Sequence, residues 1–131
     1  FDDFAESKPS IIKYNGGEIK EFPMSVQSFL GRKFAVTGGG YFRFFPYRFM
    51  KKMIKKEDYT MTYFHPRDFD FQQPLMEGLS FERRFKSYYN LSNSYSKLKK
   101  LVSDFDFIDM RQASSDIDWD KVPIVDLSHY K

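Results

Sequence analysis

A histidine at the end of an extended run is the first residue of this sequence that could do chemistry. His65 closes residues 59–65 (Tyr-Thr-Met-Thr-Tyr-Phe-His), whose β-branched and aromatic types predict a buried, central strand. Pro66 ends that run, because the residue before a proline favours extended backbone. Barrel enzymes place catalytic groups at the carboxyl ends of strands, and an imidazole there can donate or accept a proton near neutral pH. Taken alone, such a histidine is more often structural than catalytic.

Three consecutive glycines are the second candidate. Gly38, Gly39 and Gly40 open the run Gly-Gly-Gly-Tyr-Phe-Arg, which ends at Arg43. Glycine permits a positive φ and a close approach of backbone to ligand, and a nearby arginine can hold an oxygen-rich or anionic group. The spacing matches neither the dinucleotide-binding motif nor the P-loop. The alternative, a tight connection from a strand to a helix, stays open at this point.

The elements that must position these residues follow from the apolar pattern. Strands are expected at residues 18–24, 33–37, 59–65 and 105–108, and helices at 46–56, 92–105 and 109–116. Residues 1–17 and 66–80 are expected to form loops, with a helical turn within 81–90. Strands that alternate with helices indicate the α/β class, and so few strands cannot close a barrel by themselves. We therefore expect residues 1–131 to be a single domain, or a fragment, that belongs to a larger unit.

The two longer helices are expected to be amphipathic. The apolar stripe of the helix at 92–105 is predicted to contain Leu91, Tyr95, Leu98, Val102 and Phe105. The helix at 46–56 turns its lysines outward, within a basic cluster of Arg43, Arg48, Lys51, Lys52, Lys55 and Lys56. A solvated helix face is the simplest interpretation of this cluster, and the aromatic residues follow no RNA-binding pattern, so no nucleic-acid partner is expected.

Composition excludes several kinds of site. Cysteine is absent, and histidine occurs twice, as His65 and His129. With no thiolate and two histidines far apart in the sequence, no three-ligand metal site is expected within the chain. No run approaches the ~18 apolar residues of a membrane span. Aromatic residues make up 20% of the chain, and although most should be buried, exposed rings are natural platforms for sugars.

Four blocks of sequence occur in an order that resembles a known enzyme family. They are residues 21–25 (Glu-Phe-Pro-Met-Ser), 38–47 (Gly-Gly-Gly-Tyr-Phe-Arg-Phe-Phe-Pro-Tyr), 63–74 (beginning Tyr-Phe-His-Pro-Arg-Asp-Phe-Asp and ending Gln-Pro) and 84–88 (Arg-Phe-Lys-Ser-Tyr). Together they resemble the C-terminal region of NodB-like polysaccharide deacetylases. These are relatives of carbohydrate esterase family four that occur in bacterial exopolysaccharide and O-antigen gene clusters. The similarity covers roughly residues 18–108.

The resemblance implies a deformed (β/α) barrel, to which this chain supplies the C-terminal strands and helices. It implies hydrolytic de-N-acetylation of a bacterial polysaccharide or of a lipopolysaccharide or O-antigen precursor. The cofactor is a divalent metal, usually zinc, which the family binds through residues of the N-terminal half that have no match here. By itself the chain is therefore expected to be inactive. His65 matches the family's late histidine, which protonates the leaving amine.

The resemblance also assigns substrate contacts and partners. The residues expected to contact the substrate are Gly39, Gly40, Tyr41, Arg43, Arg67 and Asp68. Many relatives have Trp-Glu where Arg67 and Asp68 stand in this sequence. The implied partners are a polysaccharide and the remaining half of the barrel, in either the bacterial cytoplasm or the envelope. The alternative function is a carbohydrate-binding module without catalysis.

Overall fold

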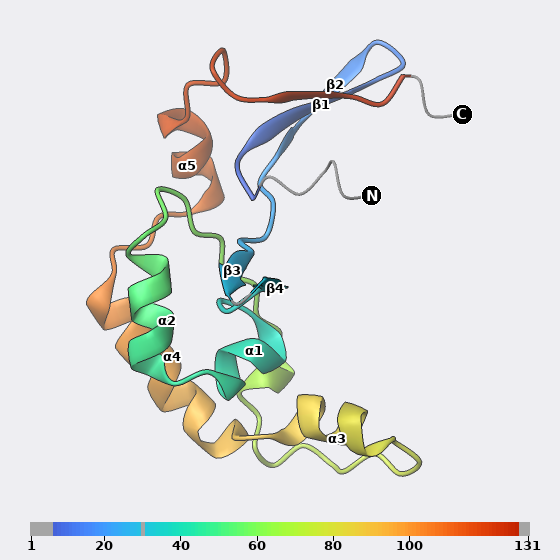
Figure 1. Ribbon diagram of the computed structural model, residues 1–131, viewed down its shortest axis with the longest axis vertical. Helices are drawn as coiled ribbons and strands as arrows, with labels where there is room; N and C mark the ends of the chain where they lie inside the picture. Colours follow the sequence, from blue (N-terminus) through green and yellow to red (C-terminus); the bar gives the residue numbers. More distant parts are fainter. Residues whose placement is uncertain (1–6, 30, 129–131) are drawn as a thin grey trace. The chain divides into compact units, whose positions relative to one another are not determined.

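Packing divides the computed structural model of this chain, which describes residues 7–29 and 31–128, into two units. Unit 1 combines the N-terminal segment up to Met24 with the C-terminal segment from Phe107, and unit 2 runs from Ser25 to Asp106 (Figure 1). Unit 2 contains His65 and the three glycines, so both candidate regions belong to the same unit. Among the described residues, no helix is both long and apolar enough to cross a membrane.

Unit 1 is built on a three-stranded sheet in the order β2-β1-β5. Its elements are β1 (Ser10–Tyr14), β2 (Gly17–Glu21), α5 (Met110–Asp116) and β5 (Ile124–Asp126). An Asn15-Gly16 turn joins β1 to antiparallel β2, and both turn residues have positive φ, as a tight hairpin requires. The strand predicted at 18–24 and the helix predicted at 109–116 are confirmed. The loop predicted for 1–17 is wrong over β1, which pairs with β2 on one side and with β5 on the other.

Unit 2 is mainly helical. Its elements are β3 (Gln27–Phe29), β4 (Arg32–Phe34), α1 (Gly39–Phe44), α2 (Tyr47–Ile54), the 3-10 turn η2 (Pro66–Asp68), α3 (Phe81–Tyr88) and α4 (Leu91–Asp104). Its core contains Val36, Phe42, Met50, Ile54 and Leu101. Figure 1 shows α2 beside α4, where Lys51 pairs with Asp104 at 2.8 Å. The helices predicted at 46–56 and 92–105 are therefore confirmed.

Residues 59–65 do not form the predicted central strand. Within the described part of the chain they form no strand, and their β-pairing is a single parallel bridge between Tyr63 and Gly38. Side chains hold the segment instead of a ladder of backbone bonds. The Thr37 hydroxyl donates to the Met61 carbonyl at 2.9 Å, and the Ser25 hydroxyl accepts from the Met61 amide at 2.7 Å. The strand predicted at 105–108 is wrong as well, because those residues pair with no strand in the part of the chain that the structure describes.

The three glycines begin helix α1. Gly38 is the extended N-cap residue, and Gly39 has φ +49°, a value in the left-handed region that favours glycine. Gly40 is needed for a different reason, because a Cβ there would lie 3.1 Å from the Lys86 carbonyl oxygen at the end of α3. The run therefore makes a tight entry into a helix and lets α3 approach it closely.

Replacing Gly40 with alanine should destabilise unit 2. The added Cβ must push the Lys86 carbonyl away, and overpacking of this kind costs about 1–3 kcal/mol. The better helix propensity of alanine offsets up to about 1 kcal/mol of that loss. We expect a lower midpoint of denaturant unfolding, followed by far-ultraviolet circular dichroism because α1 to α4 lie in this unit.

The matched control is Gly17→Ala in β2. There the added Cβ meets its nearest neighbour, the Tyr14 carbonyl oxygen, at an ordinary 3.5 Å. This variant should unfold at the wild-type midpoint or slightly above it. Equal stability of Gly40→Ala and wild type would show that the approach of α3 does not depend on a missing side chain.

Candidate functional site

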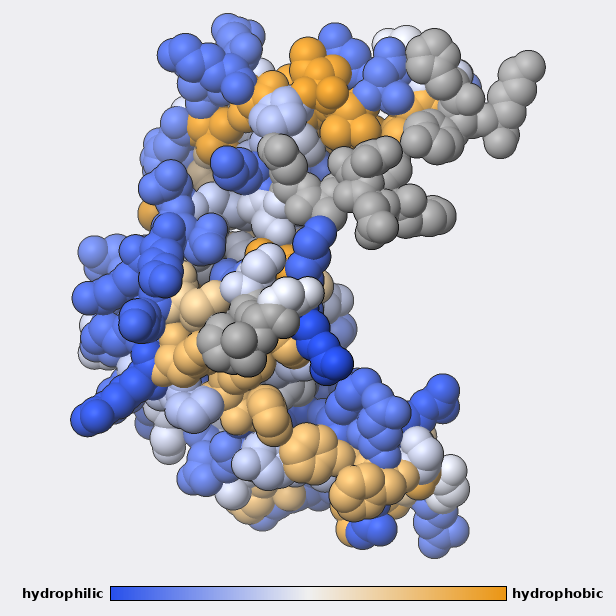
Figure 2. Space-filling model, in the orientation of Figure 1, coloured by the Kyte–Doolittle hydropathy of each residue, from blue (hydrophilic) through white to orange (hydrophobic). Residues whose placement is uncertain are grey.

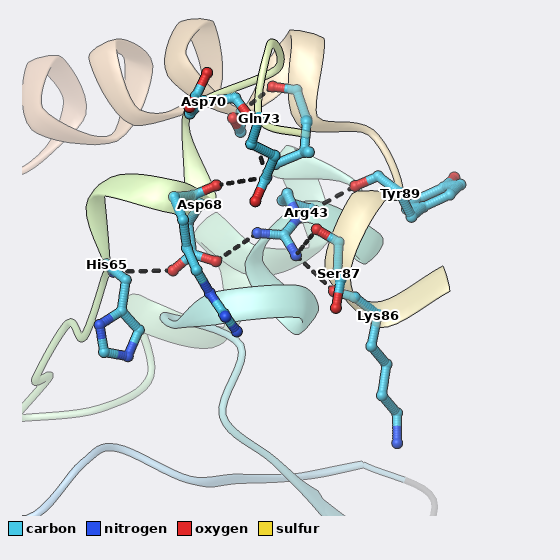
Figure 3. A network of polar contacts seen from close by, with 11 residues as sticks. Arg43, His65, Asp68, Asp70, Gln73, Lys86, Ser87 and Tyr89 are labelled. Atoms are coloured by element: carbon cyan, nitrogen blue, oxygen red, sulfur yellow. Dashed lines mark hydrogen bonds and ion pairs between the residues drawn. The ribbon is translucent and has the colours of Figure 1, made fainter. Parts of the chain in front are cut away.

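A buried ion pair lies at the centre of the candidate site. The Arg43 side chain from α1 and the Asp68 side chain from η2 are 2% and 7% exposed, and Nη1 of Arg43 donates to Oδ1 of Asp68 at 2.6 Å. Figure 3 shows this pair inside a larger polar network. Charges taken out of water are costly unless they are paired and hydrogen-bonded, so both side chains must be held in place.

The guanidinium of Arg43 also binds the carboxyl end of α3. Nε donates to the Tyr89 carbonyl at 3.1 Å, and Nη2 donates to the Lys86 carbonyl at 2.6 Å. The last carbonyls of a helix lack partners within it and carry partial negative charge, which suits a cation. Arg43 thereby joins α1, η2 and α3.

The second carboxylate oxygen of Asp68 leads to His65. Oδ2 of Asp68 accepts the backbone N–H of His65 at 2.9 Å, and the Asp68 N–H donates back to the His65 carbonyl at 2.9 Å. These two bonds close the η2 turn and fix the backbone of the histidine. The imidazole is exposed, and Figure 3 shows it pointing away from the arginine.

The predicted site residues therefore separate into two groups. His65 and Arg67 are exposed on η2 and its N-cap, and Tyr41 is 41% exposed on α1. Arg43 and Asp68 are buried, and their charged atoms bond to one another and to backbone groups. Gly39 and Gly40 shape the entry to α1. The structure brings Arg43, Asp68 and His65 together, with the first two supporting the third.

Two residues that the sequence reasoning missed complete the support. Asn90, which has φ +54°, donates from Nδ2 to the Arg43 carbonyl at 3.1 Å. Lys97 on α4 is partly buried, and its ammonium donates to the carbonyls of Phe42 and Phe45 at the end of α1. Lys97 lies one residue before Leu98 of the apolar stripe. This position beside the stripe was the feature of the sequence that could have indicated its partial burial.

No candidate group of metal ligands is found among the described residues. Within residues 7–29 and 31–128, no three histidine, aspartate or glutamate side chains converge as metal ligands. His129, the other histidine considered in the sequence, lies outside the described residues. The resemblance assigns the zinc ligands to the N-terminal half of the barrel, so no step through a metal is derived for the residues of this chain.

Comparison with known families matches nearly the whole chain. The chain belongs to the family described as a domain of unknown function, DUF3473, whose model matches residues 2–115. This domain is associated with the C-terminal regions of polysaccharide deacetylases. No curated protein and no solved structure matches the chain. The resemblance noted in the sequence is thus confirmed at the level of the domain family.

Asp68→Asn should destabilise unit 2 strongly. The change keeps the shape of the side chain but leaves the Arg43 guanidinium buried without a counter-charge, a kind of loss that costs about 3–5 kcal/mol. We expect a lower unfolding midpoint and faster hydrogen exchange of the His65 amide. The control, Glu82→Gln, breaks an ion pair with Lys86 in which both side chains are more than 60% exposed, and it should leave both measurements unchanged. Similar effects of the two variants would contradict a special role for the buried pair.

Lys97 should make stability depend on alkaline pH. Burial lowers the pKa of Lys97 from 10.5 to about 8 in the folded protein. Between these two values the unfolded chain binds the proton and the folded chain releases it, so folding becomes more favourable as pH rises. The unfolding midpoint of wild type should therefore rise relative to Lys97→Met from pH 8 to 10.5. A constant difference across this range would show that the pKa is not lowered.

Proposed function

We propose that this chain is the C-terminal part of a hydrolytic, metal-dependent polysaccharide N-deacetylase, and that His65 protonates the leaving amine. One observation carries the proposal. An exposed imidazole is held at its backbone by Asp68, which a fully buried arginine holds in turn. Membership of a domain family associated with the C-terminal regions of polysaccharide deacetylases supports the same reaction.

The chemistry explains why a histidine is needed. In amide hydrolysis an oxygen of water bonds to the acetyl carbon, and the bond from that carbon to the sugar nitrogen breaks. The nitrogen leaves readily once it has gained a proton, because an amide anion is a far worse leaving group. A histidine titrates near neutral pH and can supply that proton. His65 therefore needs a fixed backbone and an accessible ring, and this chain provides both.

The remaining catalytic groups are assigned to another part of the enzyme. When bound, a divalent metal such as zinc polarises the acetamide carbonyl and the attacking water. We propose that its ligands, together with the catalytic base, belong to the N-terminal half of a deformed (β/α) barrel. In that arrangement this chain supplies the proton donor and part of the wall around it. The exposed Arg67 and Tyr41 remain candidates for substrate contact, and the proposed substrate is a bacterial polysaccharide or a lipopolysaccharide or O-antigen precursor.

A second candidate function is favoured by a group of exposed rings. Phe44, Phe85 and Tyr89 are between 38% and 51% exposed, and Phe85 stacks on Tyr89 with ring centroids 4.5 Å apart. Figure 2 shows hydrophobic residues gathered over α1 and α3, where these rings lie. Flat exposed rings can stack against the faces of sugars, so a carbohydrate-binding module without catalysis would also use this surface.

Replacing His65 with alanine separates the two functions. In the intact enzyme, loss of the proton donor should lower the rate of acetate release by about 10²–10⁴-fold. Metal content, measured by elemental analysis, should stay unchanged, because His65 is not proposed as a ligand. Binding of the N-acetylated oligosaccharide, measured by calorimetry, should change little.

The control is His129→Ala, the same change at the other histidine of the chain, and it should keep wild-type turnover. Near-normal turnover of the His65 variant would refute its role as the acid. Oligosaccharide binding without acetate release by the unmodified enzyme would favour the binding module instead.

A further inference from the structure

The ring of Tyr63 lies directly against the imidazole of His65. Their ring centroids are 4.9 Å apart and their planes meet at 80°, an edge-to-face contact. Tyr63 is 55% exposed, and His65 is exposed beside it. The two rings therefore form a pair on the surface of unit 2.

The local backbone explains this pairing, because Tyr63 forms a β-bridge and His65 has extended φ and ψ angles. Successive side chains of such backbone point to opposite sides, so the exposed residues 63 and 65 share one side while the half-buried residue 64 faces the other. Phe64 accordingly packs inward, with its ring centroid 4.7 Å from that of Phe42 and 5.3 Å from that of Phe69. The inward packing of the half-buried Phe64 thus sets the direction in which Tyr63 and His65 point.

The backbone on both sides of Phe64 is fixed. The Tyr63 N–H donates to the Thr37 carbonyl at 3.3 Å, and the His65 N–H donates to Asp68 at 2.9 Å. The imidazole ring is exposed, and its edge-to-face neighbour is the Tyr63 ring. Contact with the Tyr63 ring is therefore a restraint on imidazole rotation that adds to the restraint on the His65 backbone.

We propose that Tyr63 is a positioning residue for His65. The inference rests on the proposed function, since it concerns how the proton donor of that reaction is aimed. Proton transfer needs the donor nitrogen within hydrogen-bond reach of the leaving nitrogen. A ring that could rotate freely would spend part of its time aimed elsewhere. The edge-to-face contact with Tyr63 reduces that freedom without altering the charge of the site.

The expected effect is moderate. Aromatic pairs of this geometry contribute enough interaction energy to change a rate by roughly 2- to 10-fold when the contact acts on the transition state. In the intact enzyme, Tyr63→Leu should therefore lower kcat by about that factor while KM and metal content stay unchanged. Tyr63→Phe keeps the ring and should restore kcat. Tyr95→Leu is the matched control, since Tyr95 on α4 is also 55% exposed, and it should behave as wild type.

A measurement independent of activity tests the contact itself. The chemical shifts of the His65 ring protons, measured by NMR, should change in Tyr63→Leu, because the ring current of the tyrosine is lost. They should stay nearly as in wild type in Tyr63→Phe and Tyr95→Leu.

Unchanged His65 chemical shifts and unchanged kcat in Tyr63→Leu would overturn the proposal. A raised KM in both Tyr63 variants would also overturn it, because the hydroxyl would then bind substrate. Absence of deacetylase activity in the wild-type enzyme would instead refute the proposed function, and the NMR result would still report whether Tyr63 orients His65.

Discussion

The ion pair of Arg43 and Asp68 is the interaction on which the candidate site of unit 2 depends. It joins helix α1, the η2 turn and the carboxyl end of α3 through a single guanidinium. A charge of this kind cannot remain in the interior without its partner, since an uncompensated buried ion is strongly destabilising. The three segments therefore cannot separate unless Arg43 returns to water. The pair acts as a geometric constraint more than as a source of net stability, because desolvation of the two charges offsets much of their attraction.

This constraint gives His65 something that a loop residue normally lacks. Connecting segments are more mobile than the elements they join, whereas proton transfer requires groups to be placed within about 0.5 Å. Here the backbone of the histidine is bound to a carboxylate that is itself locked below the surface. The rigid part of the site is buried and charged, and the part available for chemistry is exposed.

Local patterns predicted the helices well and the burial of individual residues poorly. The 3.6-residue period located α2 and α4, but the stripe of α4 was assigned wrongly at Tyr95 and Val102. Both are 55% exposed, while Ser94 and Leu101 are buried in their place. Hydrophobicity alone could not reveal that a polar serine is buried at this position, with its hydroxyl donating to the Leu91 carbonyl one turn earlier. Residues 59–65 have the composition of a strand, yet among the described residues they have one bridge to Gly38 and no partner strand. The existence of a partner is not encoded in the segment itself. The burial of Arg43 and Asp68 depends likewise on long-range pairing.

Two of the four blocks that carry the family resemblance, residues 38–47 and 63–74, are connected by this pairing. Gly40 and Arg43 lie three residues apart on α1 and therefore face α3 together, with the glycine giving space for the Lys86 carbonyl that the arginine binds. The same arginine then reaches Asp68, which closes the turn after His65. A chain with the first block but without the second would bury an unpaired cation, and one with the second alone would bury an unpaired carboxylate. Segments separated by 25 residues are thus required together for a physical reason, and the exposed histidine is what their joint arrangement holds in place.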